Sequence, residues 1–125
     1  MDRRQVQAWL DRYVEAWRTN DPEQIGALFT DDAVYRYRPY DEARNAVRGL
    51  SPIVENWLEE QDPPGSWEAH YEPFAVDGDR AVATGTSRYL ASAKGPARTY
   101  HNAFLLRFGP DGRCAEFTEY YMLEE

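Results

Sequence analysis

The 125-residue chain is 42% hydrophobic and 14% aromatic, which is typical of one globular domain with a packed core and excludes a disordered segment. Its net charge of −8 repels a phosphate backbone, and its arginines are scattered, so we expect no nucleic-acid binding. No apolar run approaches the ~18 residues of a membrane span, and no secretory signal precedes the first predicted helix. We therefore expect a cytoplasmic protein that does not enter a membrane, with residues 1–125 as its one domain.

The N-terminal third predicts two helices and a short strand. Residues 2–18 carry an apolar stripe at helical spacing, formed by Val6, Trp9, Leu10, Tyr13, Val14 and Trp17. Asp21 is predicted to cap a second, two-turn helix, with Pro22 at its first position and Gln24 completing a capping box. This helix is expected to bury Ile25, Leu28 and Phe29 and to end at Thr30, Asp31 and Asp32. Residues 33–37 then alternate as a short strand.

The rest of the chain predicts a loop, a third helix and a run of strands. Residues 38–49 are polar and without period, so we interpret them as a lid over a pocket mouth. Ser51 and Pro52 are the expected cap and first residue of a helix that ends before the prolines at 63 and 64. Turn residues then separate four predicted strands that form three successive antiparallel hairpins, at about residues 66–76, 80–91, 97–108 and 113–122.

This order of elements resembles the nuclear transport factor 2-like (NTF2-like) superfamily. Residues 13–35 are similar to its opening segment, and residues 111–121, where a turn glycine precedes an aromatic strand that contains an acid, resemble the terminal strand of its SnoaL-like members. The resemblance implies an α+β cone, with three N-terminal helices packed on a strongly curved mixed or antiparallel sheet that encloses a pocket. It also implies a homodimer. The superfamily includes isomerases, dehydratases, cyclases, epoxide hydrolases and non-catalytic binding proteins, so the fold does not select an activity.

Ketosteroid isomerase, one member of the superfamily, provides a residue-by-residue test. Its oxyanion tyrosine corresponds to Tyr13, which matches. Its general-base aspartate falls on Tyr37 and its second oxyanion acid on Phe104, and neither matches. A double-bond shift needs a carboxylate that carries the proton, so that activity is not expected at these positions. The Asp–Arg–Asp arrangement that holds water in the epoxide-hydrolase branch is not located in the sequence either.

Glu119 is the strongest candidate for chemistry. Strand alternation places it on one face with Phe117 and Tyr121, which the resemblance turns toward the pocket. Burial would raise the pKa of its carboxyl and suit it to proton transfer near neutral pH. The alternative is a structural hydrogen bond to Asn102 or to an arginine on the adjacent strand. Asn102 itself is predicted to orient Glu119 or to bind a ligand carbonyl.

Two further side chains complete the predicted catalytic set of Glu119, Tyr13, His70 and Asn102. Tyr13 is expected to donate a hydrogen bond into the pocket. His70 is taken as the better acid–base histidine because it shares a row with Phe74 and Val76, although the row of Trp67, Ala69 and Tyr71 competes for the interior. His101 is expected on the outer face or at a dimer contact. Aromatic walls of the pocket are predicted from Trp17, Tyr35, Tyr37, Trp57, Tyr89, Phe104, Phe117 and Tyr121, with core packing as the alternative for each.

The sequence contains no motif for a metal or a cofactor. Two histidines without ligand spacing and one cysteine, Cys114, leave too few metal ligands, and Cys114 is expected to be buried and unreactive. We therefore expect no metal and no cofactor. Three hypotheses stay open: a cofactor-free acid–base enzyme (isomerase, cyclase or dehydratase type) acting on a small hydrophobic molecule, a binding module for such a molecule, and a dimeric interaction module without a pocket.

Overall fold

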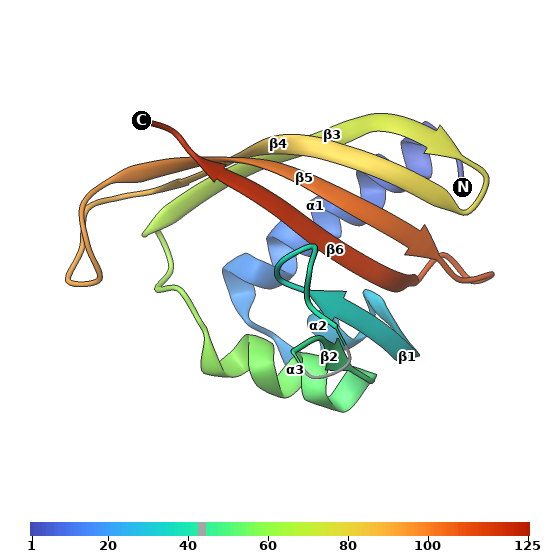
Figure 1. Ribbon diagram of the computed structural model, residues 1–125. Helices are drawn as coiled ribbons and strands as arrows, with labels where there is room; N and C mark the ends of the chain where they lie inside the picture. The colour runs from blue at the N-terminus through green and yellow to red at the C-terminus, as the bar shows by residue number, and fades with distance from the viewer. Residues whose placement is uncertain (43–44) are drawn as a thin grey trace.

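The long first helix closes one side of the fold. The structure, a computed structural model, describes residues 1–42 and 45–125. Helix α1 spans Arg3–Thr19, and the Asp2 side chain accepts a hydrogen bond from the Gln5 backbone while the Gln5 side chain accepts one from the Asp2 backbone. This capping box fixes the start of the helix. Four residues of the predicted apolar stripe are buried, namely Val6, Trp9, Leu10 and Tyr13, while Val14 and Trp17 are half-buried. Figure 1 shows α1 crossing beneath the curved sheet.

The second helix is shorter than predicted. Helix α2 spans Pro22–Gly26, and strand β1 runs over Phe29–Arg36, so the predicted helical ending at Thr30 to Asp32 is wrong. The chain becomes extended there because the carbonyl of Leu28 accepts bonds from Trp9 Nε1 at 3.0 Å and from the Cys114 backbone at 2.8 Å. The Asp21 cap is confirmed. The Gln24 capping box is wrong, because the Gln24 amide oxygen accepts from the Thr19 hydroxyl at 2.6 Å.

The predicted lid segment contains a strand. Strand β2, Val47–Arg48, pairs antiparallel with β1, and helix α3, Leu50–Glu59, follows directly. Gly49 is the N-cap of α3 and Leu50 its first residue, so the prediction of Ser51 as the cap and Pro52 as the first residue is wrong. The Gly49 backbone has a φ of 91° and bonds to Ala33 O at 2.8 Å, a conformation that favours glycine. Residues 43 and 44 of the predicted lid lie outside the described part of the chain.

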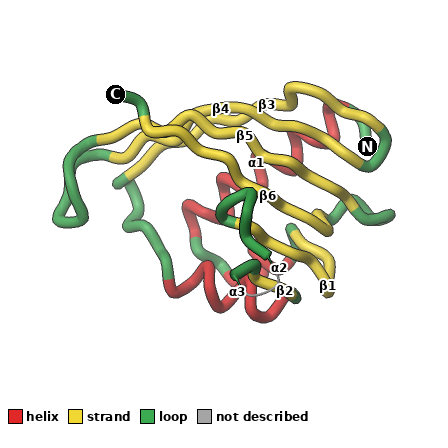
Figure 2. Tube along the Cα trace, in the orientation of Figure 1, coloured by secondary structure: helices red, strands yellow, loops and turns green. Residues whose placement is uncertain are grey.

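Four long strands follow as the predicted meander: β3 (Trp67–Asp77), β4 (Arg80–Tyr89), β5 (Arg98–Phe108) and β6 (Cys114–Leu123). The strand order is β2-β1-β6-β5-β4-β3, in which β1 pairs parallel with β6 and every other pair is antiparallel. The sheet is therefore mixed. Figures 1 and 2 show β3 to β6 curving over α1, while α3 lies below beside β1 and β2.

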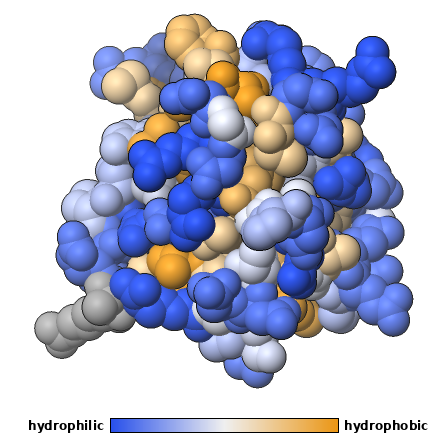
Figure 3. All heavy atoms as spheres, turned by 90° about the vertical axis from the view of Figure 1, so that its right-hand side faces the viewer, coloured by the Kyte–Doolittle hydropathy of each residue, from blue (hydrophilic) through white to orange (hydrophobic). Residues whose placement is uncertain are grey.

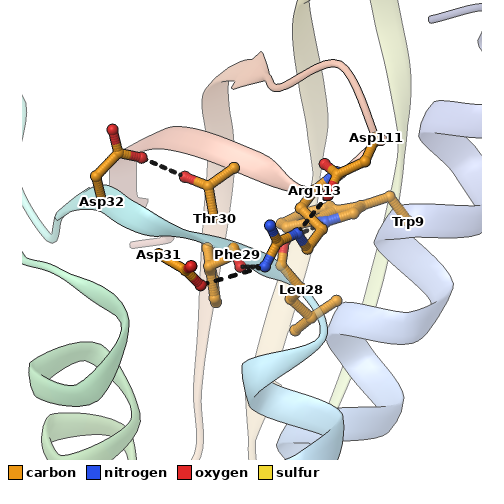
Figure 4. Close-up of polar contacts among 8 residues, drawn as sticks. All are labelled: Trp9, Leu28, Phe29, Thr30, Asp31, Asp32, Asp111 and Arg113. Carbon is orange, nitrogen blue, oxygen red and sulfur yellow. Dashed lines mark hydrogen bonds and ion pairs between the residues drawn. The ribbon is translucent and has the colours of Figure 1, made fainter.

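Polar contacts at the N-terminal end of α1 join elements that are distant in sequence (Figure 4). The Trp9 ring nitrogen bonds to the Leu28 carbonyl, and Arg113 donates to the Phe29 carbonyl at 3.3 Å and to Asp111 at 2.7 Å. These bonds tie α1, the start of β1 and the β5–β6 turn together. Figure 3 views this end of the molecule, where hydrophilic residues cover most of the surface. The cavity described below lies toward the other end of α1, at Tyr13 and Trp17.

Candidate functional site

A cavity of about 710 Å³ lies between the C-terminal half of α1, α3, β1 and the inner face of the sheet. Aromatic side chains from all of these elements line it: Tyr13, Trp17, Tyr35, Tyr37, Trp57, Tyr71, Tyr89, Tyr100 and Tyr121. Amide and charged side chains also contribute, namely Asn20, Arg38, Asp41, Asn45, Asn56, Glu60, Asp62, Lys94, Arg98, Asn102 and Glu119. The lining thus combines aromatic rings with many polar and charged groups, so the cavity is not purely apolar.

Glu119 on β6 lies at the end of a chain of hydrogen bonds that joins four neighbouring strands, β3 to β6. Asn102 on β5 donates from Nδ2 to Glu119 Oε2 at 3.0 Å. Ser87 on β4 donates from Oγ to Asn102 Oδ1 at 2.8 Å. The hydroxyl of Tyr71 on β3 bonds to the same Ser87 Oγ. All four residues line the cavity.

The donors of this chain all point toward the carboxylate. Because Ser87 has one hydroxyl proton and gives it to Asn102, Tyr71 is the donor in its bond with Ser87. The same bond fixes the Asn102 amide with its oxygen toward Ser87 and its NH2 group toward Glu119. Asn102 can therefore only donate to Glu119, as the ionised carboxylate requires.

The Glu119 carboxyl is partly buried and has Asn102 as its one hydrogen-bond partner among the described residues. Loss of hydration raises its pKa from 4.5 to about 7, and the bond from Asn102 partly opposes this rise. A carboxyl with this pKa is present in both protonation states near neutral pH. It can therefore accept a proton and return it.

A pair of tyrosine hydroxyls from α1 and β1 also faces the cavity. Tyr13 and Tyr35 are joined by a 2.9 Å bond between their hydroxyl oxygens. Burial raises the pKa of both well above the usual value, and the nearby Glu119 charge raises both further. Both phenols stay neutral at ordinary pH. Since one proton suffices for the bond between them, the other hydroxyl proton remains available for a ligand oxygen.

Charged side chains line the cavity near the β4–β5 hairpin, after the end of α3 and on the segment after β1. Asp62 accepts from Trp17 Nε1 at 3.0 Å and lies 3.7 Å from Lys94 Nζ. Arg98 lies over the ring of Tyr89, with its Cζ 4.5 Å from the ring centroid. Arg38 forms an ion pair with the buried Asp41 at 3.1 Å. Cations and anions therefore both contribute to this part of the lining.

Most of the predicted site residues meet at this cavity. Glu119, Tyr13 and Asn102 of the predicted catalytic set line it. So do six predicted wall residues: Trp17, Tyr35, Tyr37, Trp57, Tyr89 and Tyr121.

Phe104 and Phe117 do not line the cavity, so their assignment as pocket walls is corrected. They are 1% and 0% exposed and belong to the core. Phe117 is enclosed because it stacks on Tyr13 and Tyr35 at centroid distances of 5.3 and 4.4 Å and contacts Phe104 at 4.7 Å. The aromatic rings around Phe117 therefore belong to the packed core, and the cavity lies outside this cluster.

His70 is also corrected, because it lies exposed on the outer face of the sheet. The inner row of β3 is Trp67, Ala69 and Tyr71, and a bulge between Pro73 and Ala75 moves Val76 to that face. The row that joined His70 to Val76 therefore does not exist. His101 is on the outer face as predicted, where its ring lies 3.1 Å from Glu124.

Ser87 and Tyr71 are functional candidates that the sequence analysis missed. Gly85 lies opposite Tyr71 on β3 and opposite Asn102 on β5. Because Gly85 has no side chain, the Tyr71 ring can lie close to the backbone of β4. A Cβ at Gly85 would lie 2.6 Å from Tyr71 Cδ1 and 1.9 Å from the His70 carbonyl oxygen. The sequence did contain one indication: a glycine inside a predicted strand often marks a place where another group packs closely, and Ser87 follows Gly85 on the same face.

The described residues form neither a metal-binding cluster nor a helix that could span a membrane. No group of three or more His, Cys, Asp or Glu side chains within them is placed to hold a metal ion. None of their helices has the length and apolarity needed to cross a bilayer.

Solved structures share this architecture at low sequence identity. An NTF-2 like protein of unknown function from Burkholderia xenovorans LB400 has a TM-score of 0.71 and 14% identity, over 98% of this chain and 86% of that one. An NTF2-like protein of unknown function from Cytophaga hutchinsonii ATCC 33406 has 0.68 and 15%, over 93% and 98%. An LEH-like epoxide hydrolase from M. tuberculosis has 0.68 and 15%, over 94% and 83%. The fold is therefore the α+β cone of NTF2-like proteins, as predicted.

The family follows from the sequence itself. The SnoaL-like domain profile matches residues 10–117, and the chain belongs to that family. A comparison with curated proteins finds no match. The predicted resemblance is confirmed, while structural likeness at 14 to 15% identity shows the fold alone.

Proposed function

We propose that this protein is a cofactor-free acid–base enzyme that moves a proton within a small molecule with an aromatic or apolar body. The observation that carries the proposal is the Glu119 carboxyl, which lines the cavity, has one hydrogen-bond donor among the described residues and has a pKa of about 7. A general base works best when its pKa is close to the operating pH. Burial of this acid therefore has a chemical use.

The other groups have matching roles in the proposed reaction. Glu119 takes a proton from a carbon next to a carbonyl, and the electron pair moves to the carbonyl oxygen. The free hydroxyl proton of the Tyr13 and Tyr35 pair donates to that oxygen. Return of the proton from Glu119 to a different atom gives an isomer. Asn102 holds the carboxylate in position throughout.

The experiment uses 2-tetralone, a two-ring ketone with acidic hydrogens beside its carbonyl, in deuterated buffer. The wild-type protein should accelerate exchange of these hydrogens as followed by proton NMR. Glu119→Gln should lower the protein-catalysed exchange rate by roughly 10²- to 10⁴-fold, the usual contribution of a general base. Its amide oxygen can still accept from Asn102, so folding should be retained.

Glu68→Gln is the matched control, because Glu68 is an exposed acid near the outer-face residue Arg88. It should exchange like the wild type. Equal exchange by Glu119→Gln and the wild type would reject Glu119 as the base. Binding of 2-tetralone without any acceleration would favour the non-catalytic binding module.

We also propose that the chain forms a homodimer through the outer face of the sheet. Large apolar side chains are exposed there on β3, β5 and β6: Phe74, Leu105, Tyr120 and Met122, at 42 to 73% exposure. Several large apolar side chains exposed on one face of a sheet are typical of a protein contact. The cytoplasmic location stays a prediction of the sequence.

A further inference from the structure

Among the described residues, three cationic side chains line the cavity, and one of these three has no acidic partner there. Arg38 pairs with Asp41 at 3.1 Å, and Lys94 lies 3.7 Å from Asp62. Arg98 lines the same cavity, and no carboxylate in the described part of the chain lies within ion-pair distance of it. Its positive charge is thus available to a ligand.

The Arg98 side chain is held in a defined place. Its guanidinium lies over the Tyr89 ring, 4.5 Å from the centroid, and its Nη1 donates to the Pro96 carbonyl at 3.3 Å. These contacts restrict the position of the group before any ligand arrives. A guanidinium has five N–H donors, so several remain after the bond to Pro96. A fixed planar fork of this kind matches the two oxygens of a carboxylate.

Arg98 lies on the same face of β5 as Glu119's partner, Asn102. Tyr100 stands between them on that face and also lines the cavity. Asn102 lies four positions after Arg98 along the strand, which is about 13 Å at 3.3 Å per residue. The rings of Tyr89 and Tyr121 meet Tyr100 edge-on from the neighbouring strands, at 5.9 and 5.6 Å. An aromatic wall therefore connects the cation with the carboxyl.

From this arrangement we propose that Arg98 binds the carboxylate of an elongated substrate with an aromatic or apolar body, whose other end reaches Glu119. The inference rests on the proposed function and names the class of substrate, an organic acid. The protein has a net charge of −8, so an anion is favoured in this cavity only beside an unneutralised cation. Arg98 then selects the acid over its uncharged analogue and sets which end meets Glu119.

The test compares two probes of the same shape, biphenyl-4-carboxylate and its neutral analogue biphenyl-4-carboxamide, by titration calorimetry at pH 8. Wild-type protein should bind the carboxylate more tightly. Arg98→Gln should weaken carboxylate binding by at least about tenfold, which corresponds to the lower end of the range for a charged hydrogen bond, and should change carboxamide binding less than about twofold. Arg98→Lys keeps the charge and should retain most of the preference.

Arg88→Gln is the matched control. Arg88 precedes Tyr89 on β4 but faces outward near Glu68, and its replacement removes the same charge. It should leave both affinities unchanged. Equal losses for the two probes in Arg98→Gln, an unchanged carboxylate affinity, or no carboxylate binding to the wild type would each overturn the inference.

The binding test does not require turnover. The same dependence on Arg98 should appear in a Glu119→Gln background, where the proposed base is absent. An Arg98-dependent preference in a protein that exchanges no deuterium would keep this inference and remove the proposed reaction. Exchange without that preference would do the reverse.

Discussion

Replacing Glu119 by glutamine should change how the free energy of unfolding depends on pH. The folded carboxyl has a pKa of about 7, against 4.5 without the fold. Between these values the unfolded state releases the proton while the folded state keeps it, so the contribution of Glu119 to the stability of the wild type falls as the pH rises. At about 1.4 kcal/mol for each pH unit, the loss across this window is about 3 kcal/mol.

Glutamine carries no proton to release, so the variant lacks this loss. Urea unfolding at intervals from pH 4.5 to pH 8 should show Glu119→Gln gaining about 3 kcal/mol relative to the wild type across the range. Other titrating groups are common to both proteins and cancel in the difference. The Glu68→Gln variant controls for the removal of one negative charge. A stability difference between Glu119→Gln and the wild type that stays constant with pH would refute the burial argument.

Two further outcomes follow from the sheet. Gly85→Ala should lower the free energy of unfolding by about 1–3 kcal/mol in thermal denaturation, because the added Cβ meets the His70 carbonyl and the Tyr71 ring. Gly26→Ala is the control and should cause no such loss, because its Cβ would meet nothing within 4 Å. Equal stability of the two variants would contradict the close approach at Gly85. Light scattering should give twice the 14.5 kDa mass of the chain, and Leu105→Glu on the exposed outer face should halve it; a single-chain mass for the wild type would reject the dimer.

The sequence predicted the inner and outer faces of β5 and β6 correctly because side chains alternate strictly along a regular strand. That rule placed Glu119 beside Asn102 and His101 outside. It failed on β3, where the bulge after Pro73 shifts the alternation. Val76 therefore lies on the inner face and His70 on the outer face, although the prediction placed both in one row. A bulge depends on how two strands fit together, which the pattern of one strand does not contain.

Depth was harder to predict than direction. Phe117 and Tyr121 share a face of β6, but Phe117 is enclosed by aromatic rings from α1, β1 and β5 while Tyr121 is 53% exposed. Which residues fill the core and which line the cavity depends on packing between distant segments. The parallel pairing of β1 with β6, which shapes this end of the sheet, is such a long-range feature.

Arg98 shows a third limit of the sequence pattern. Its significance comes from the absence of a carboxylate partner among the described residues, while Lys94, four positions earlier, has Asp62 nearby. Spacing along the chain gives no information on which acids and bases meet in space.

The most direct test of the central claim is an NMR titration of the Glu119 side-chain carboxyl carbon in the wild-type protein, with the signal assigned by its loss in Glu119→Gln. We expect a midpoint near pH 7, as burial at the cavity requires. A midpoint close to 4.5 would show a hydrated carboxyl and would contradict the role of Glu119 as a base.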